Sequence, residues 1–279
     1  RSVITDEGRD CLSDLLTMLI LPCNIFLSFE GNTDMSALKS SLLTVIISVL
    51  VMLCTAILGK VIYRHREERK AKVFRYGLVN SNALFIGLPI IQSLLGDAGV
   101  LQLSMYMIFV RMFCWSYGLS LYTGVKSDWK GSFKRLLTHP CMIAAALGVA
   151  AMVTGIRLPA FLDRTLQYVS SCLMALSMLL IGVVLSEIKL KEVFRGDVWR
   201  FTALRLGVMP GIVFGLCKLC GVPYIVTATC TLVSGMPAAS LTAVLAARYH
   251  GDSELGALLV AVSTILSAVT IPLWFMILQ

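Results

Sequence analysis

Long apolar stretches recur along this chain, and they constrain its fold more than any other feature. Each is about 20 residues or longer, enough for an α-helix that rises 1.5 Å per residue to cross a hydrocarbon core roughly 30 Å thick. Of the 279 residues, 57% are hydrophobic and 14% are charged, whereas soluble domains have roughly 25% charged residues. The sequence therefore predicts an all-α polytopic membrane protein with nine spans. They lie at about 10–29, 37–63, 74–95, 100–123, 138–156, 165–186, 198–219, 223–247 and 255–278.

Basic residues gather in alternate gaps between these spans. The formal net charge is +8, and 19 Lys and Arg residues, Arg205 among them, fall on the side of gaps 60–75, 124–137 and 186–205, against 4 on the other side. This asymmetry places the basic gaps in the cytoplasm of a cell in whose plasma or inner membrane the chain lies, and Gln279 outside, extracellular or periplasmic. Because the basic residues form no single patch with interleaved aromatic residues, the expected partner is the lipid bilayer and not a nucleic acid.

Two spans carry a Gly-x-Pro in their middle: Gly87-Leu88-Pro89 in the third span and Gly235-Met236-Pro237 in the eighth. Proline removes a backbone donor and glycine permits non-helical backbone, so we expect a broken helix at each. A Gly-Asp pair follows each one, at residues 96–97 and 251–252, so the chain resembles itself at an offset of about 148 residues. Two unrelated proline kinks are the alternative interpretation.

If the eighth span repeats the third, the fifth to ninth spans form a five-helix unit, and the first unit lacks its first helix. Units with an odd number of spans are inverted relative to each other, which is common in secondary transporters. The expected organisation is a first repeat at 1–123, a cytoplasmic linker at 124–137 and a second, inverted repeat at 138–279.

The two breaks are the predicted substrate-binding site. Paired interrupted helices point to the site in transporters, and the amides of a half-helix N-terminus suit a carboxylate or another anion. Three polar residues precede the first break, and their side chains can bind a carboxylate or instead cap freed backbone groups. The predicted substrate-binding residues at the breaks are Asn80, Ser81, Asn82, Gly87, Pro89, Gly235, Met236 and Pro237.

Arg111 lies in the middle of the fourth span with no acidic residue nearby in sequence. A central arginine costs about 2.5–3.5 kcal/mol on insertion scales, so we expect it to face the protein interior or water and to bind the anion. The structural alternative is a bond to the carbonyls of a broken helix. No Asp or Glu lies at mid-span, which argues against an exchanger that uses buried carboxylates.

The remaining reactive residues do not suggest an enzyme. Cys217 and Cys220 form a CxxC, but no histidine or second CxxC accompanies them, so we interpret them as small core residues. His65, His139 and His250 lie in loops or at span ends. With no phosphate loop and no nucleophile with its base, the sequence predicts no catalytic residue, metal or cofactor.

Several motifs together resemble the auxin efflux carrier family, which includes plant PIN carriers and bacterial malonate or malate permeases. The motifs are NALFIGLP at 82–89, LLGD at 94–97, MPAA at 236–239, ARYHGDSE at 247–254, Leu21-Pro22, His139-Pro140, STILS at 263–267 and IPL at 271–273. The resemblance covers essentially the whole chain. It implies ten helices in two inverted five-helix repeats whose broken helices cross at their prolines, similar to NhaA and the bile-acid symporters.

The same resemblance implies organic-anion substrates held beside the crossover and an elevator-type movement. This sequence departs from the family in two ways: the first family helix is absent, and Arg111 stands where bacterial relatives carry Asn or another neutral residue. The substrate can therefore differ from theirs.

The resulting hypothesis is a secondary transporter of a small organic anion, such as a mono- or dicarboxylate. The rivals are a sodium-coupled symporter of similar architecture, in which unwound carbonyls bind the ion, and a non-transporting membrane sensor. The sequence leaves the oligomeric state open, a homodimer included.

The charge asymmetry gives a testable topology. In a cysteine-free background, a cysteine at position 68 should react with a membrane-impermeant thiol reagent only after the cells are opened, and one at position 279 should react in intact cells. Labelling of position 68 from outside intact cells would reverse the assigned orientation.

Overall fold

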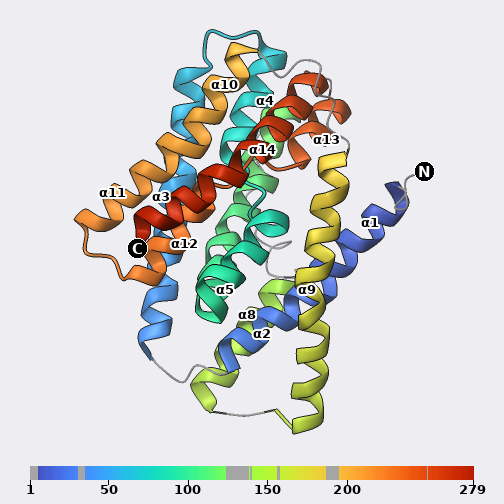
Figure 1. Cartoon of the computed structure of the whole chain (residues 1–279), viewed down its shortest axis with the longest axis vertical. Coiled ribbons are helices and arrows are strands. Elements are labelled where there is room, and N and C mark those ends of the chain that lie inside the picture. Colours follow the sequence, from blue (N-terminus) through green and yellow to red (C-terminus); the bar gives the residue numbers. More distant parts are fainter. Residues whose placement is uncertain are drawn as a thin grey trace.

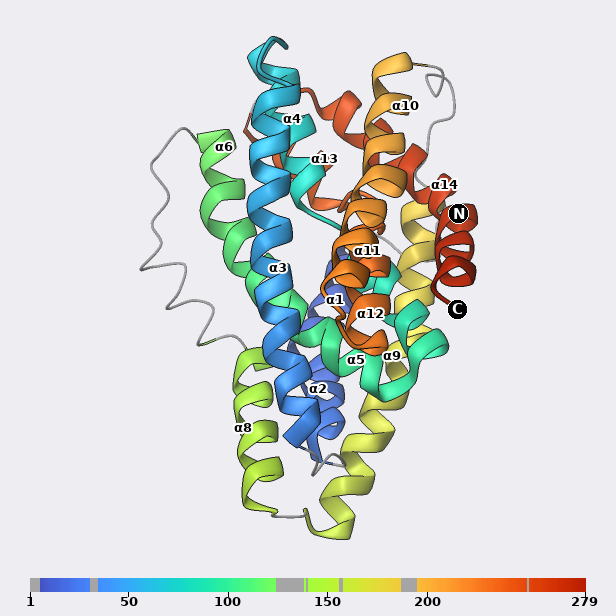
Figure 2. The same ribbon diagram turned by 90° about the vertical axis from the view of Figure 1, so that its left-hand side faces the viewer.

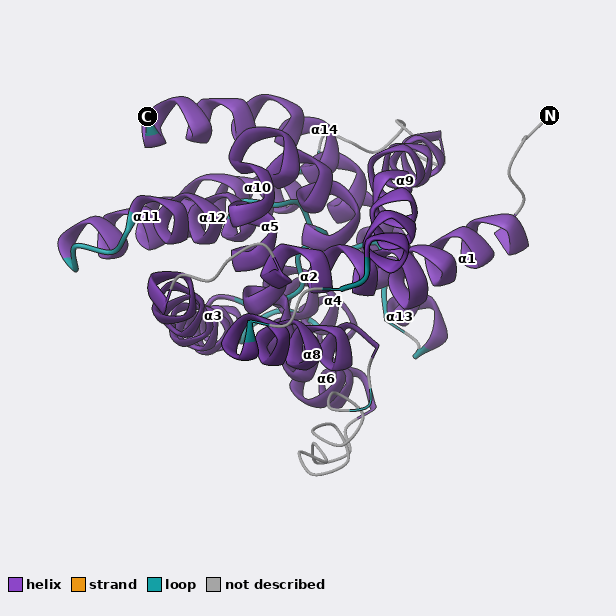
Figure 3. Cartoon of the chain, turned by 90° about the horizontal axis from the view of Figure 1, so that it is seen from below, coloured by secondary structure: helices purple, strands orange, loops and turns teal. Residues whose placement is uncertain are grey.

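The computed structural model describes residues 6–30, 35–123, 138, 140–155, 158–186, 195–249 and 251–279, and these are almost entirely helical (Figure 3). The predicted linker at 124–137, His139 and His250 lie outside the described residues. The α-helices are α1 (Asp6–Leu15), α2 (Leu21–Glu30), α3 (Met35–Ile62), α4 (Glu68–Val79), α5 (Leu88–Phe113), α6 (Leu119–Thr123), α8 (Pro140–Thr154), α9 (Ala160–Ser186), α10 (Gly196–Ala203), α11 (Met209–Leu219), α12 (Tyr224–Ser234), α13 (Leu241–Arg248) and α14 (Ser253–Leu278). Short π-helical segments are η1 (Leu16–Ile20), η2 (Ala83–Gly87), η3 (Cys114–Gly118) and η5 (Leu204–Val208).

Four helical stretches in the described part of the chain are long and apolar enough to cross a membrane. They are Lys39–Ile62, Leu88–Arg111, Gly196–Leu219 and Ser253–Leu278. The chain is an all-α polytopic membrane protein, as the apolar runs predict. Fewer stretches qualify than the nine predicted spans because several spans are interrupted or short. For example, α12 ends after 11 residues. The qualifying stretch Leu88–Arg111 covers parts of two predicted spans, and Gly96, with φ 63° and ψ −158°, bends it between them.

The helices form two groups by their contacts. In Figures 1 and 2 the labels α2 and α8 lie below α4, α10 and α13, whereas α3 and α9 each run along much of the length of the molecule; we call the groups lower and upper. The lower group contains α1, α2, α8 and α9, and within it the side-chain nitrogen of Asn24 donates a hydrogen bond to the Ser170 hydroxyl at 2.7 Å. The upper group contains α3–α5 and α10–α14. The groups touch where α5 contacts α2 and α9, and where η2 contacts α9.

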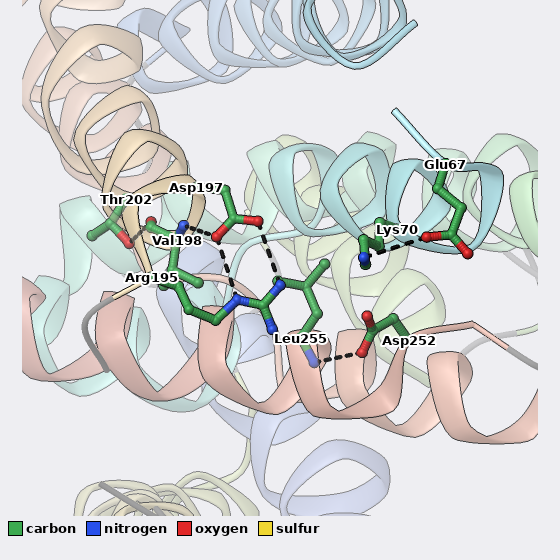
Figure 4. Close-up of polar contacts among 8 residues, drawn as sticks. All are labelled: Glu67, Lys70, Arg195, Asp197, Val198, Thr202, Asp252 and Leu255. Carbon is green, nitrogen blue, oxygen red and sulfur yellow. Dashed lines mark hydrogen bonds and ion pairs between the residues drawn. The ribbon is translucent and has the colours of Figure 1, made fainter. Parts of the chain in front are cut away.

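Charged residues collect where α4, α10 and α14 begin (Figure 4). Arg195 pairs with Asp197 at 3.5 Å between Nε and Oδ1, and Asp252 caps α14 by accepting a hydrogen bond from the Leu255 amide at 2.9 Å. The carboxylate at this helix N-terminus also lies favourably in the helix dipole. This end of the upper group has the polarity of a surface that faces water.

The helices α4 and α12 both stop inside the upper group, and the residues after them pair with each other. Ser81 and Ala238 form an isolated antiparallel bridge. The Asn82 amide donates to the Pro237 carbonyl at 2.8 Å, and the Ala239 amide donates to the Asn80 carbonyl at 3.1 Å. We call residues 80–82 and 235–240 the paired breaks.

The first break does not lie at the predicted Gly-x-Pro. Gly87 and Leu88 have helical backbone angles, φ −70° with ψ −39° and φ −60° with ψ −52°, so that part of the prediction is wrong. Pro89 lies two residues after η2, which runs directly into α5, so this proline does not interrupt the helix, and its fixed φ suits a helical conformation. The interruption lies earlier, at residues 80–82, whereas residues 235–237 do interrupt the second helix.

The geometry of the bridge predicts an engineered disulfide. The two hydrogen bonds join the neighbours of Ser81 and Ala238, so these two residues form a non-hydrogen-bonded pair, whose Cα atoms are typically about 4.5 Å apart. That separation falls within the disulfide range. In a cysteine-free background, Ser81→Cys with Ala238→Cys should oxidise to an intramolecular disulfide.

A protease site inserted in 124–137 allows the chain to be cut between the two cysteines. On a non-reducing gel, the two fragments then migrate together only if the disulfide has formed. Each single-cysteine variant is the matched control and should separate. Complete separation of the double variant under oxidising conditions would contradict the observed pairing.

Candidate functional site

Arg205 joins the two paired breaks. Its Nε donates to the Met236 carbonyl at 3.0 Å, and its Nη1 donates to the Leu78 carbonyl. Leu78 belongs to the last turn of α4, and Met236 follows the end of α12. Carbonyls at helix C-termini lack intrahelical partners and carry the negative end of the helix dipole. A guanidinium between two such ends satisfies both of them.

Arg205 is 2% exposed, and it is the one buried charged side chain among those that the structure describes. A guanidinium has five N–H donors, and these two hydrogen bonds use two of them, which leaves donors for a ligand. No buried carboxylate in the described part of the chain balances its charge. A buried charge without a counter-ion is costly, so the site favours a negatively charged ligand.

The local sequence explains how Arg205 reaches the breaks. It lies in the π-helical segment η5, and such segments are frequent at functional sites because they insert an extra residue into a helix. Pro210, which has no N–H, cannot bond the Leu206 carbonyl one turn back. The Trp274 indole N–H of α14 donates to that carbonyl instead, at 2.8 Å. The segment is thus fixed to α14 next to the paired breaks.

The basic-residue pattern assigns Arg205 to a cytoplasmic gap, and the structure shows that this prediction is wrong. Arg205 lies inside the Gly196–Leu219 stretch, in a run of apolar residues. Without Arg205 the asymmetry is still 18 to 4. The signal that could have found Arg205 is the same one that singled out Arg111, an arginine within a predicted span.

The structure places the three polar residues of the first break in the protein interior. Asn80, Ser81 and Asn82 are 4%, 8% and 3% exposed. The side-chain nitrogens of Asn80 and Asn82 are buried and have no hydrogen-bond partner in the described part of the chain. Asn82 stands at the N-cap position of η2, but its side chain makes no capping hydrogen bond. The Asn82 amide is therefore available to a ligand, and the Asn80 amide lies beside the weakly accepting Cys114 thiol.

Two helix N-termini add further donors at the paired breaks. η2 starts directly after Asn82, and α13 starts directly after Ser240. Among the backbone-to-backbone hydrogen bonds outside helices in the described residues, none is donated by the amides of Ala83, Leu84 or Leu241. First-turn amides with the positive end of a helix dipole behind them bind anions. The donors of Asn80, Asn82, Arg205 and these N-termini are thus gathered in one region.

The remaining predicted residues of the breaks have packing roles. Gly87 lies against the Met236 side chain, 3.4 Å from where a Cβ would be, and Gly235 lies against the Pro210 ring at 3.2 Å. Pro237 supplies the carbonyl that accepts from Asn82. Ser263 of α14, which the sequence gave no reason to select, donates to the Leu259 carbonyl and accepts from the Ala238 amide at 3.1 Å.

Arg111 lies in the last turn of α5 and is only half-buried. The alternative role, a bond to the carbonyls of a broken helix, is taken by Arg205 at Leu78 and Met236. The part of Arg111 in binding therefore stays a prediction. Among the described residues, no three His, Cys, Asp or Glu side chains gather as a metal site.

Comparison with known proteins identifies the family. Residues 1–275 match the model of a family described as membrane transport protein. The chain belongs to the auxin efflux carrier family. It is 26% identical over 287 residues to an uncharacterised transporter of Methanocaldococcus jannaschii, across 98% of this chain and 90% of that protein. It is also 26% identical over 282 residues to one of Methanothermobacter thermautotrophicus, across 99% and 91%.

This auxin efflux carrier family member is accordingly a multi-pass membrane transporter. The resemblance that its motifs suggest is thereby confirmed at the level of family and fold class.

The two Gly-x-Pro motifs look equivalent in sequence, but their surroundings predict different responses to an added methyl group. A Cβ at Gly87 would meet the flexible Met236 side chain at 3.4 Å, an ordinary contact, and Gly87→Ala should cost less than about 1 kcal/mol. A Cβ at Gly235 would meet the rigid Pro210 ring at 3.2 Å, and Gly235→Ala should cost about 1–3 kcal/mol.

Thermal unfolding of the two purified variants gives the comparison directly, with the wild-type chain as reference. A larger loss of stability for Gly87→Ala than for Gly235→Ala would contradict the packing described here.

Proposed function

We propose that this transporter carries a small organic anion, such as a mono- or dicarboxylate, and binds it at the paired breaks. The observation that carries the proposal is the surplus of buried donors there. The region contains Arg205, the side-chain nitrogens of Asn80 and Asn82, and the first amides of two helices. In the described part of the chain, no buried carboxylate is present to accept hydrogen bonds from these donors. A carboxylate ligand supplies both the acceptors and the negative charge that this region lacks.

The arrangement of the two helix groups supports alternating access of the elevator type. The paired breaks belong to the upper group, and η2, directly after the first break, contacts α9 of the lower group. An anion bound at the breaks would therefore lie near the boundary between the groups. In the proposed movement the upper group carries the anion past the lower group, which stays fixed in the membrane.

The inverted repeat supports the proposal as a sequence pattern. Each half of the chain contributes one of the paired breaks, from the proposed repeats 1–123 and 138–279. The proposed topology, with the end that gathers Arg195 and Asp197 in the cytoplasm and Gln279 outside, follows from the basic-residue asymmetry.

A thermal-shift screen of mono- and dicarboxylates on the purified protein identifies the ligand. An anion at 100 times its dissociation constant should stabilise the native state by about 2.7 kcal/mol. Uptake of that anion into proteoliposomes above the level of empty vesicles then separates a carrier from a non-transporting sensor. Binding without any flux would favour the sensor.

Asn82 provides the test of location. Asn82→Ala removes a donor to a charged ligand, worth about 1.5–3 kcal/mol, so the dissociation constant of the identified anion should rise roughly ten- to a hundred-fold. Asn82→Asp should weaken binding further, because a carboxylate would face the bound anion. Gln167→Ala is the control: this exposed amide side chain of α9 bonds Asp163 on its own helix, and its removal should leave affinity unchanged.

Arg111→Gln, measured in the same assay, decides whether that arginine also contributes. A loss of affinity with a normal melting temperature would include Arg111 in the site. Unchanged affinity of the correctly folded Asn82→Asp variant would refute binding at the paired breaks.

A further inference from the structure

The hydrogen bonds of Arg205 bear on how this transporter is coupled to cations. In transporters with interrupted helices, unwound carbonyls and half-helix C-terminal ends are the groups that bind Na⁺. Here the corresponding carbonyls are those of Leu78 and Met236, and both accept hydrogen bonds from Arg205. The positions that a sodium ion would need are therefore occupied by a positive charge that belongs to the chain.

We propose that Arg205 is a resident cation that takes the place of a coupling sodium ion at the paired breaks. The guanidinium is permanently protonated, so the charge is present at every physiological pH. Native stability and ligand binding at the breaks are then independent of Na⁺. This inference concerns the carbonyl side of the breaks and does not depend on which ligand the donors on the other side hold.

Three contacts fix the guanidinium in this role. The bond from Trp274 to the Leu206 carbonyl holds η5 to α14, at the residue next to Arg205. The Pro210 ring packs on Gly235, which brings the Arg205 helix close to the second break. Ser263 accepts from the Ala238 amide and so holds the same break to α14. A planar fork with several donors can bridge two carbonyls, whereas a lysine ammonium acts as a point charge.

The test compares thermal unfolding of purified protein in sodium chloride and in choline chloride at equal ionic strength, without any organic anion. The wild-type chain should have the same melting temperature in both salts. Arg205→Ala leaves two buried carbonyls and a void, so in choline its melting temperature should fall by about 5 °C or more. Sodium or guanidinium at millimolar concentration should restore it in a saturable manner, because either ion can enter the vacated position.

Arg200→Ala is the matched control, since Arg200 lies on the same helical stretch but is exposed. It should show neither the loss nor the rescue. Saturable stabilisation of the wild-type protein by Na⁺ would overturn the proposal, and so would an Arg205→Ala variant that is destabilised but rescued by neither ion.

If Arg205→Ala cannot be purified, the wild-type chain and Arg205→Lys still decide the question. Binding of radioactive Na⁺ to wild-type protein in detergent should not exceed that of a blank, and Arg205→Lys should keep a melting temperature that is the same in sodium and choline. Saturable sodium binding by either protein would refute the resident cation. Because no organic anion is present, these outcomes are separate from success or failure of the anion-binding proposal.

Discussion

Backbone groups buried in a membrane must find hydrogen-bond partners within the protein, and the rest of this structure depends on how two broken helices meet that requirement. An unsatisfied N–H or C=O in the hydrocarbon region costs several kcal/mol, because no water is available to it. The ends of α4 and α12 would expose such groups. The structure satisfies them by pairing residues 80–82 with 237–239 and by placing Arg205 against the Leu78 and Met236 carbonyls.

At the breaks the hydrogen-bond acceptors find partners within the protein, whereas several donors do not. This surplus of donors is the physical basis of the proposed function. The freed carbonyls are taken up by Arg205 and by the paired amides. In the described chain the side-chain nitrogens of Asn80 and Asn82 remain without partners, and the amides of Ala83 and Leu241 donate no backbone-to-backbone hydrogen bond outside helices. A region with a fixed positive charge and surplus donors is complementary to a carboxylate, and a ligand that completes these hydrogen bonds can pass through a membrane that excludes it otherwise.

Sequence reasoning recovered the class of protein because apolar runs of membrane length carry a strong signal, and the motifs at 82–89 and 236–239 identified the family. It also singled out Gly235-Met236-Pro237, which does interrupt a helix, and the polar residues 80–82, because glycine, proline and paired asparagines are unusual in the middle of an apolar span. The exact position of the first break was predicted wrongly. Pro89 is compatible with a helical conformation, and only tertiary pairing of Asn80 and Asn82 with the second break decides where the helix stops.

Arg205 and Ser263 could not be assigned from sequence for a similar reason. In sequence Arg205 lies at the edge of a basic gap and is counted with it. Its side chain is buried through hydrogen bonds to Leu78 and Met236, which lie 127 and 31 positions away in the sequence. Ser263 is one of several small polar residues on α14, and its role depends on lying opposite the Ala238 amide. Such roles are long-range and become visible only in three dimensions.

An experimental structure of the protein with the anion that the thermal-shift screen identifies would show directly where that anion binds. The account predicts ligand density at the paired breaks, with a carboxylate oxygen within hydrogen-bond distance of the Asn82 side-chain nitrogen and of an amide at the start of η2 or α13. The Arg205 guanidinium would still contact the Leu78 and Met236 carbonyls. Density for the anion elsewhere, with the Asn80 and Asn82 nitrogens bonded to protein groups, would contradict it.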